Sequence, residues 1–239
     1  MSESQHYIDE RAPLLSQPSP TVETNKRVAN LLSVTTQAGV VLFVVLVWSV
    51  LLTTPWSLFS YHPASMTVLV VGATEGMSDK TGGIIPTYTA PEKKKGLRRH
   101  AFLQALAYTS AILGFTAITH NKALHDKPHI TSVHAHFGVF TFSFLFIQLL
   151  FGIVIAYAPS VVGGTPQAKS LWKYHRISGY VLLVLIWATA QLGAHAEFMV
   201  DNFPKPKLLW LYWVSLVLVS IGIAKRTDVS KWGVKRQRS

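Results

Sequence analysis

The sequence predicts an all-α membrane protein, a bundle of six transmembrane helices. Hydrophobic residues make up 49% of the 239-residue chain and charged residues only 14%, a balance suited to lipid rather than to a water-facing surface. The apolar residues gather in runs close to the roughly 20 residues that a helix needs to cross a bilayer. Basic residues flank these runs instead of lining one amphipathic face, so the formal charge of +11 does not indicate nucleic-acid binding.

Six segments form the predicted spans. The segments over 31–54, 133–158 and 172–194 are strongly apolar, and those over 101–119 and 208–224 are sufficiently so. The segment over 57–77 is the weakest, because its apolar stretch is short and Glu75 lies near its end. The predicted transmembrane domain is therefore 30–225. A polar, disordered tail over 1–29 precedes it, and a basic tail over 226–239 follows it.

The distribution of basic residues predicts the orientation. With six crossings, all but four of the 22 Lys and Arg residues fall on one side of the membrane; the four are Lys122, Lys127, Lys205 and Lys207. Omitting the weak span over 57–77 would reduce this asymmetry. The positive-inside rule therefore favours six crossings with both termini in the cytosol.

The chain contains no cysteine. This excludes disulfides, iron–sulfur clusters, thiolate zinc sites and covalently attached c-type haem.

Four histidines share one placement, because each opens a predicted span: His62, His100, His134 and His175. Successive spans alternate in direction, so His62 and His134 are expected at the non-cytosolic level and His100 and His175 at the cytosolic level. Two imidazoles at one level fill both axial positions of a haem iron and leave none for oxygen or substrate. The pattern predicts two haem b groups that transfer electrons across the membrane.

Two glycines support this interpretation. Gly138 and Gly179 each follow a candidate ligand by four residues, about one helical turn, where a position without a side chain lets a flat macrocycle approach the backbone. The alternative is that these glycines only help helices to pack. His136 competes with His134 but points to nearly the opposite helix face, and His134 is preferred because Gly138 lies one turn after it.

Four segments around these histidines are similar, in order and spacing, to the eukaryotic cytochrome b561 family. They are SLFSYHPASM (57–66), KGLRRHAFLQ (95–104), HITSVHAHFG (129–138) and LWKYHRISGYV (171–181). The resemblance covers about residues 30–225 and looks closest to the shorter, b561-domain-containing reductase branch. It implies a six-helix bundle, a homodimer, and the four histidines as haem ligands.

The resemblance also implies electron transfer from cytosolic ascorbate to monodehydroascorbate or ferric iron on the opposite side. Other branches of the family carry a Tyr-Ser-Leu-His-Ser-Trp type of segment where this chain has residues 131–136, TSVHAH. That departure is compatible with haem binding and leaves the acceptor open.

Basic residues near the cytosolic histidines predict an ascorbate site. Ascorbate is an anion at neutral pH, and a positive field concentrates and orients it. The candidate substrate residues are Lys93, Lys95, Arg98, Arg99 and Lys173. The alternative is that these charges only set the topology and bind anionic lipid.

A second polar cluster is expected at the non-cytosolic mouth. Its members are His120, His125, His129, His195, Asp126, Glu197 and Asp201. They are candidates to hold a metal-ion substrate transiently, and His129 is also a candidate partner for a haem propionate. The alternative is ordinary hydrogen bonding of surface imidazoles.

The segment Glu10–Leu15 fits an acidic dileucine sorting pattern and indicates a vacuolar, lysosomal or endosomal membrane. Two other functions stay open: a metal transporter that uses the histidines as ligands, and a haem-free structural membrane protein. No predicted span has a charge at its centre, which disfavours transport.

Overall fold

The structure of this chain is a computed structural model that describes residues 20–78 and 90–224. Within these ranges the chain is helical and contains no strand. Its helices are α1 (Pro20–Thr53), α2 (Tyr61–Ser78), α3 (Ala90–Leu124), α4 (Val133–Tyr157), α5 (Thr165–Ala194), α6 (Glu197–Asp201) and α7 (Leu211–Ala224). Short 3-10 helices η2 (Leu58–Ser60), η4 (Pro159–Val162) and η5 (Pro206–Leu208) lie in the connections. The predicted all-α bundle is confirmed.

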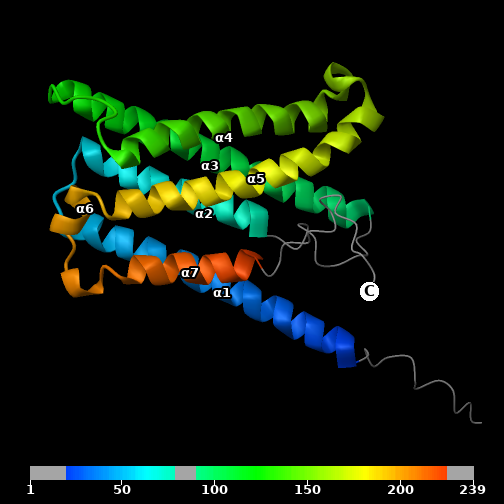
Figure 1. Cartoon of the computed structure of the whole chain (residues 1–239), viewed down its shortest axis with the longest axis horizontal. Coiled ribbons are helices and arrows are strands. Elements are labelled where there is room, and N and C mark those ends of the chain that lie inside the picture. The colour runs from blue at the N-terminus through cyan, green and yellow to red at the C-terminus, as the bar shows by residue number, and fades with distance from the viewer. Residues whose placement is uncertain (1–19, 79–89, 225–239) are drawn as a thin grey trace, which may run out of the picture.

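The long helices form three antiparallel pairs, α1 with α7, α2 with α3, and α4 with α5 (Figure 1). Glycines let α1 and α7 approach closely. A Cβ atom at Gly39 would lie 2.7 Å from the carbonyl oxygen of Ser215, and one at Gly222 would overlap the Thr36 hydroxyl. Small residues at a contact are typical of packed membrane helices, where close approach replaces a hydrophobic driving force.

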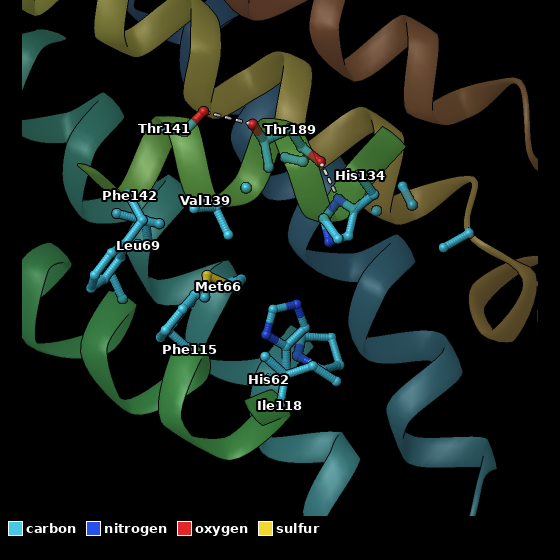
Figure 2. A pocket seen from close by; sticks show the side chains of 18 of the residues that line it. His62, Met66, Leu69, Phe115, Ile118, His134, Val139, Thr141, Phe142 and Thr189 are labelled. Carbon is cyan, nitrogen blue, oxygen red and sulfur yellow. Dashed lines mark hydrogen bonds between the residues drawn. The ribbon is translucent and has the colours of Figure 1, made fainter. Parts of the chain in front are cut away.

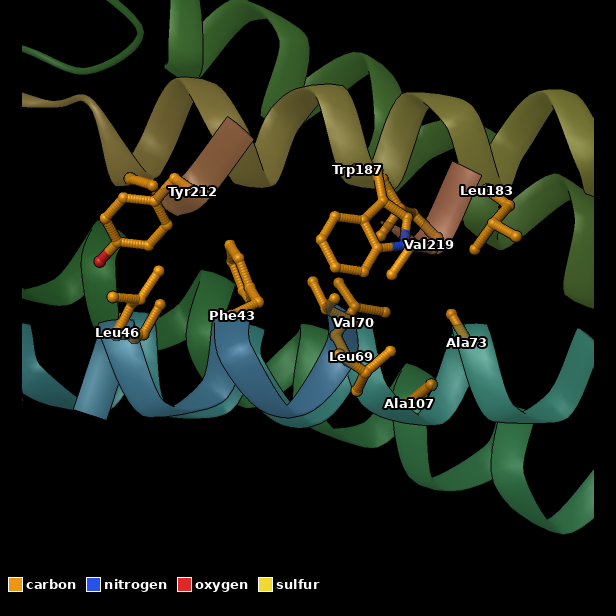
Figure 3. Close-up of a cluster of buried hydrophobic side chains, with 14 of the residues drawn as sticks. Phe43, Leu46, Leu69, Val70, Ala73, Ala107, Leu183, Trp187, Tyr212 and Val219 are labelled. Atoms are coloured by element: carbon orange, nitrogen blue, oxygen red, sulfur yellow. The ribbon is translucent and has the colours of Figure 1, made fainter. Parts of the chain in front are cut away.

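A buried cluster joins these pairs (Figure 3). The ring of Phe43 on α1 lies 5.2 Å from the ring of Trp187 on α5 and 5.9 Å from that of Tyr212 on α7, in edge-on geometry. The indole nitrogen of Trp187 donates a hydrogen bond to the Thr74 hydroxyl on α2 at 3.0 Å. The core therefore holds α1, α2, α5 and α7 together and supports the helices that carry the histidines.

The surface of the bundle suits lipid. Five segments are long and apolar enough to cross a membrane: Arg27–Thr53, Lys94–Leu124, Val133–Tyr157, Thr165–Ala194 and Pro206–Ala224. Helix α4 exposes large apolar side chains, among them Phe140, Ile147 and Ile153, which water would not stabilise. The chain is thus a multi-pass membrane protein. Helix α2 is not among the five, because Tyr61, His62 and Glu75 leave it a short apolar centre, so the sixth crossing stays a prediction.

Helix boundaries differ from the sequence-based prediction in two places. Helix α1 begins at Pro20, so residues 20–29 are helical rather than part of a disordered tail; proline is well suited to the first turn of a helix. Helices α3 and α5 begin ten residues before His100 and His175, so these histidines lie inside helices and not at their starts. The preceding residues are mostly good helix formers, with a proline in each first turn.

Part of the prediction lies outside the described residues. This applies to residues 1–19, including the Glu10–Leu15 sorting pattern, to 79–89, and to the C-terminal segment 225–239.

Candidate functional site

The first histidine pair joins α2 and α4. The ring centroids of His62 and His134 are 6.0 Å apart, with ring planes at 79° (Figure 2). Nδ1 of His62 lies 3.0 Å from the carbonyl oxygen of Gly114, and Nδ1 of His134 lies 3.0 Å from that of Thr189. When Nδ1–H donates to these carbonyls, Nε2 of each ring is left for another partner.

The second pair joins α3 and α5. The ring centroids of His100 and His175 are 6.5 Å apart, with ring planes at 85°. Nδ1 of His100 lies 2.8 Å from the carbonyl oxygen of Gly76. Nδ1 of His175 instead lies 3.2 Å from Nε2 of the Gln148 side chain. The structure therefore brings together the same two pairs that the sequence predicts.

The spacing of both pairs fits one metal between two imidazoles. A metal–nitrogen bond to histidine is about 2.0–2.1 Å long, and the ring centroid lies roughly 1 Å behind the nitrogen, so two ligands of one metal have centroids about 6 Å apart. An Nδ1–H bonded to a carbonyl is also the usual arrangement behind a metal-ligating histidine, because it fixes the ring and its tautomer. Three of the four histidines have this support.

One spacing rule relates the two pairs. Each of α2, α3, α4 and α5 carries a histidine and, 14 residues later, the residue that supports the histidine of its antiparallel neighbour. The supports are Gly76 after His62, Gly114 after His100, Gln148 after His134 and Thr189 after His175. Fourteen residues of helix rise about 21 Å, so the pairs lie at well-separated levels of a core about 30 Å thick.

A cavity of about 460 Å³ surrounds His62 and His134 (Figure 2). Apolar side chains such as Met66, Phe115 and Phe142 form most of its wall, with Lys122 and His129 among the few charged or titratable lining residues. Its size is in the range of cofactor sites. Gly138 lines this cavity, and a Cβ atom there would meet no atom closer than Thr189 Cγ2 at 3.9 Å, which leaves room for a flat ring.

Gly179 has a different environment from the one predicted. A Cβ atom there would lie 3.2 Å from Gln148 Nε2 and 3.6 Å from Met77 Cε, so side chains occupy the space expected for a macrocycle. Two other glycines, Gly193 and Gly152, lie where a side chain would collide with a histidine ring. Cβ atoms at these positions would lie 2.8 Å from Cε1 of His134 and of His175, respectively.

Sequence reasoning missed Gly152 and Gly193, although a signal is present. Helices α4 and α5 carry the same four-position pattern with an offset of 41 residues. The positions are His134, Gly138, Gln148 and Gly152 on α4, and His175, Gly179, Thr189 and Gly193 on α5. In this antiparallel pair, each histidine ring packs over the last glycine of the other helix.

The predicted ascorbate residues lie at the end of the bundle that holds His100 and His175. Lys95, Arg98 and Arg99 are exposed in the N-terminal part of α3, to which Lys93 also belongs. Lys173 is exposed on α5, with Nζ 4.8 Å from the centroid of the Tyr174 ring.

His136, the residue that competes with His134 in the sequence, is exposed on α4, and its Nδ1 lies 2.9 Å from the carbonyl oxygen of Ser132.

The residues predicted to cluster at the opposite mouth do not form a metal site of three ligands within the described part of the chain. His129 lines the cavity, His125 bonds to the Asn121 carbonyl at 2.7 Å, and the ring of His195 packs 5.3 Å from that of Trp213. Within residues 20–78 and 90–224, no three His, Asp or Glu side chains lie close enough to hold a metal ion. The sequence places these residues at one membrane level but carries no information on their lateral separation.

The bundle and its histidines define a class, a multi-pass membrane protein with two imidazole pairs spaced to share a metal. The sequence profile of the eukaryotic cytochrome b561 family matches residues 83–200 of this chain. Proteins of this family normally bind haem b. The matched region contains His100, His134 and His175, whereas His62 precedes it. This match supports the family resemblance predicted from the sequence.

Two relatives are similar to this chain, the "Transmembrane reductase CYB561D2" proteins of Mus musculus and Bos taurus. Each is 30% identical over 141 residues, which cover 57% of this chain. The match spans 61% of the length of each relative.

Proposed function

We propose that this chain carries electrons across its membrane on two haem b groups, one held by His62 and His134 and the other by His100 and His175. The observation that carries the proposal is the geometry of the two pairs, whose ring centroids are 6.0 Å and 6.5 Å apart. A haem iron with two imidazole ligands supplies a one-electron couple and has no position open for oxygen.

The surrounding residues hold the histidines in place. The carbonyl oxygens of Gly76, Gly114 and Thr189 orient three of the rings. The mostly apolar wall of the cavity around His62 and His134 suits the apolar faces of a porphyrin ring. We assign His129, on that wall, to a haem propionate or to monodehydroascorbate as the anionic acceptor.

We assign cytosolic ascorbate as the donor. It docks against the basic surface formed by Lys95, Arg98, Arg99 and Lys173, with Lys93 assigned to the same substrate site, and it loses one electron and one proton to become monodehydroascorbate. The electron leaves at the end of the bundle that holds His62 and His134, where monodehydroascorbate or ferric iron accepts it. The relatives are named transmembrane reductases, which supports the transfer of electrons to an acceptor.

The remaining assignments follow the charge pattern and the family. We place the transmembrane domain at 30–225, both termini in the cytosol, and a homodimer in a vacuolar, lysosomal or endosomal membrane reached through the Glu10–Leu15 signal.

An absorption spectrum of the purified protein tests the proposal. We expect about two haems per chain, with low-spin b-type bands in the ascorbate-reduced minus oxidised spectrum. A colourless protein, or one whose haem ascorbate does not reduce, would overturn it.

Two glycine substitutions should each affect one haem. In Gly193→Ala the new methyl group meets Cε1 of His134, and in Gly152→Ala it meets Cε1 of His175, both at 2.8 Å. Because each ring is also held by a contact at Nδ1, it has little freedom to move away from the new methyl group. We expect Gly193→Ala to weaken retention of the His62/His134 haem, and Gly152→Ala that of the His100/His175 haem, measured as haem per chain and by redox titration. Each variant is the control for the other, and equal loss of both haems would contradict the prediction.

Removing two charges should slow electron entry without loss of haem. Lys95→Gln with Arg98→Gln removes exposed positive charge beside His100. We expect a roughly tenfold lower rate of ascorbate reduction at low ionic strength, and a smaller difference at high salt, because steering by exposed charges is screened.

The matched control for this pair is Lys205→Gln with Lys207→Gln, which removes two exposed charges from the other end of the bundle. Its ascorbate rate should equal that of the unmodified protein. Equal rates of ascorbate reduction in all three proteins would mean that Lys95 and Arg98 only set the membrane topology.

A further inference from the structure

The cavity around His62 and His134 has a polar rim on one side. Lys122, near the C-terminal end of α3, lines the cavity together with His129 and Ser132 of the loop that joins α3 to α4. This loop lies at the end of the bundle that carries α6 (Figure 1). Among the residues that the structure describes, no Asp or Glu lines the cavity, so its wall offers the Lys122 ammonium group no carboxylate.

The α3–α4 loop is held against the cavity. Nζ of Lys122 donates a hydrogen bond to the carbonyl oxygen of Pro128 at 2.9 Å, which ties the loop to α3. Ile130, which lines the cavity, has a φ of 53°, in the left-handed region that β-branched residues rarely adopt. Such a conformation persists only where the surrounding structure enforces it, and it is typical of functional sites. The rim therefore has a defined shape.

The rim offers a positive charge and hydrogen-bond donors. An ammonium group has three N–H donors, and the Pro128 carbonyl uses one of those of Lys122. The Ser132 hydroxyl accepts a hydrogen bond from the backbone N–H of Ala135 at 3.2 Å and keeps its own hydrogen to donate. Ser132 also caps α4, so the positive end of the α4 dipole lies at this rim. A carboxylate would be stabilised here, whereas the rest of the wall suits an apolar ring.

The position of Lys122 relative to the histidine pair fits the edge of a haem. Lys122 lies eight residues after Gly114, whose carbonyl oxygen faces His62. Eight residues of helix rise about 12 Å, so this cation lies beyond the histidine pair, toward the end of the bundle that carries α6. Haem b is a flat apolar ring with two propionates on one edge. A ring held between His62 and His134, with that edge turned to the rim, has matching surroundings on each side.

We propose that Nζ of Lys122 binds a propionate of the His62/His134 haem, and that His129 and Ser132 hydrogen-bond to the same edge of the ring. The proposal rests on the proposed function, because it assumes a haem between these two histidines. It assigns the charge on this wall to retention and orientation of the cofactor, and not to binding of the electron acceptor.

Transfer of haem to apomyoglobin measures retention in the detergent-purified full chain, and redox titration of the remaining haem identifies the site that loses it. In Lys122→Gln we expect the His62/His134 haem to leave roughly tenfold faster, because a charge-assisted hydrogen bond is lost. Its midpoint potential should fall, since removing a nearby cation stabilises ferric iron. Lys122→Arg should keep both properties, and the His100/His175 haem should be unchanged in both variants.

A second cofactor separates the charge of Lys122 from its contact with the loop. Apoprotein from haem-deficient cells is loaded with haem b or with haem dimethyl ester, in which both propionates are uncharged. The unmodified chain should release the ester faster than haem b from the His62/His134 site, whereas Lys122→Gln should release the two at similar rates. If Lys122 only holds the loop through Pro128, the substitution should accelerate release of both cofactors by the same factor, which would overturn the proposal.

The matched control is Lys127→Gln. Lys127 is an exposed lysine of the same loop that does not line the cavity, so haem release and potential should equal those of the unmodified protein. If Lys122→Gln behaves like Lys127→Gln, or slows reduction of the acceptor while haem release stays unchanged, Lys122 does not bind the propionate. A purified protein without any haem would instead overturn the proposed function.

Discussion

His100→Ala should reduce the haem content from about two per chain to about one and abolish reduction of the remaining haem by ascorbate. His100 is paired with His175 at the end of the bundle where basic residues of α3 and α5 are exposed. Removing this imidazole leaves one ligand for that haem. Since the two histidine pairs lie about 21 Å apart along the helices, ascorbate at the cytosolic surface then has no nearby electron acceptor.

The informative measurement compares two reductants. Dithionite, a small reductant that does not depend on the basic surface, should still reduce the remaining haem of His100→Ala, whereas ascorbate should not. His120→Ala is the control, because it changes an exposed histidine on the same helix, 20 residues further along α3. Unchanged ascorbate reduction in His100→Ala would contradict the assigned point of entry.

The pairing of the four histidines was predictable because it depends on few physical quantities. Helix length is set by bilayer thickness, and successive spans alternate in direction. These two constraints are sufficient to assign His62 and His134 to one level and His100 and His175 to the other. The all-α bundle follows from the same reasoning, because within lipid a helix satisfies its own backbone hydrogen bonds.

The supports behind the histidines were not predictable in the same way. Gly76, Gly114 and Thr189 act through backbone carbonyls, a group that every residue carries and that leaves no mark in the sequence. The 41-residue offset marks Gly152 and Gly193 in the sequence, but their role is clear only once α4 and α5 are known to be antiparallel neighbours, because each glycine contacts a histidine of the other helix. The residues predicted to cluster at the non-cytosolic mouth do not form a metal site for a related reason: a shared membrane level does not bring side chains on different elements together.

The second prediction with a large expected effect on haem content separates His134 from His136 as the ligand. His134→Ala should remove the haem of the His62/His134 pair, whereas His136→Ala should retain about two haems per chain. His134 lines the cavity opposite His62, while His136 is exposed and bonds locally to the Ser132 carbonyl. Haem content and redox titration of the two variants measure the difference.

The kinetic behaviour of His134→Ala should also be the reverse of that of His100→Ala. The His100/His175 haem remains in place beside the basic surface, so ascorbate should still reduce it at close to the normal rate. Electron delivery to an acceptor enclosed in proteoliposomes should nevertheless stop, because the chain has lost its exit site on the other side. If instead His136→Ala loses haem and His134→Ala does not, the cavity around His62 and His134 is not the cofactor site. If His134→Ala still delivers electrons to the enclosed acceptor, the electron leaves by a route that does not involve this pair.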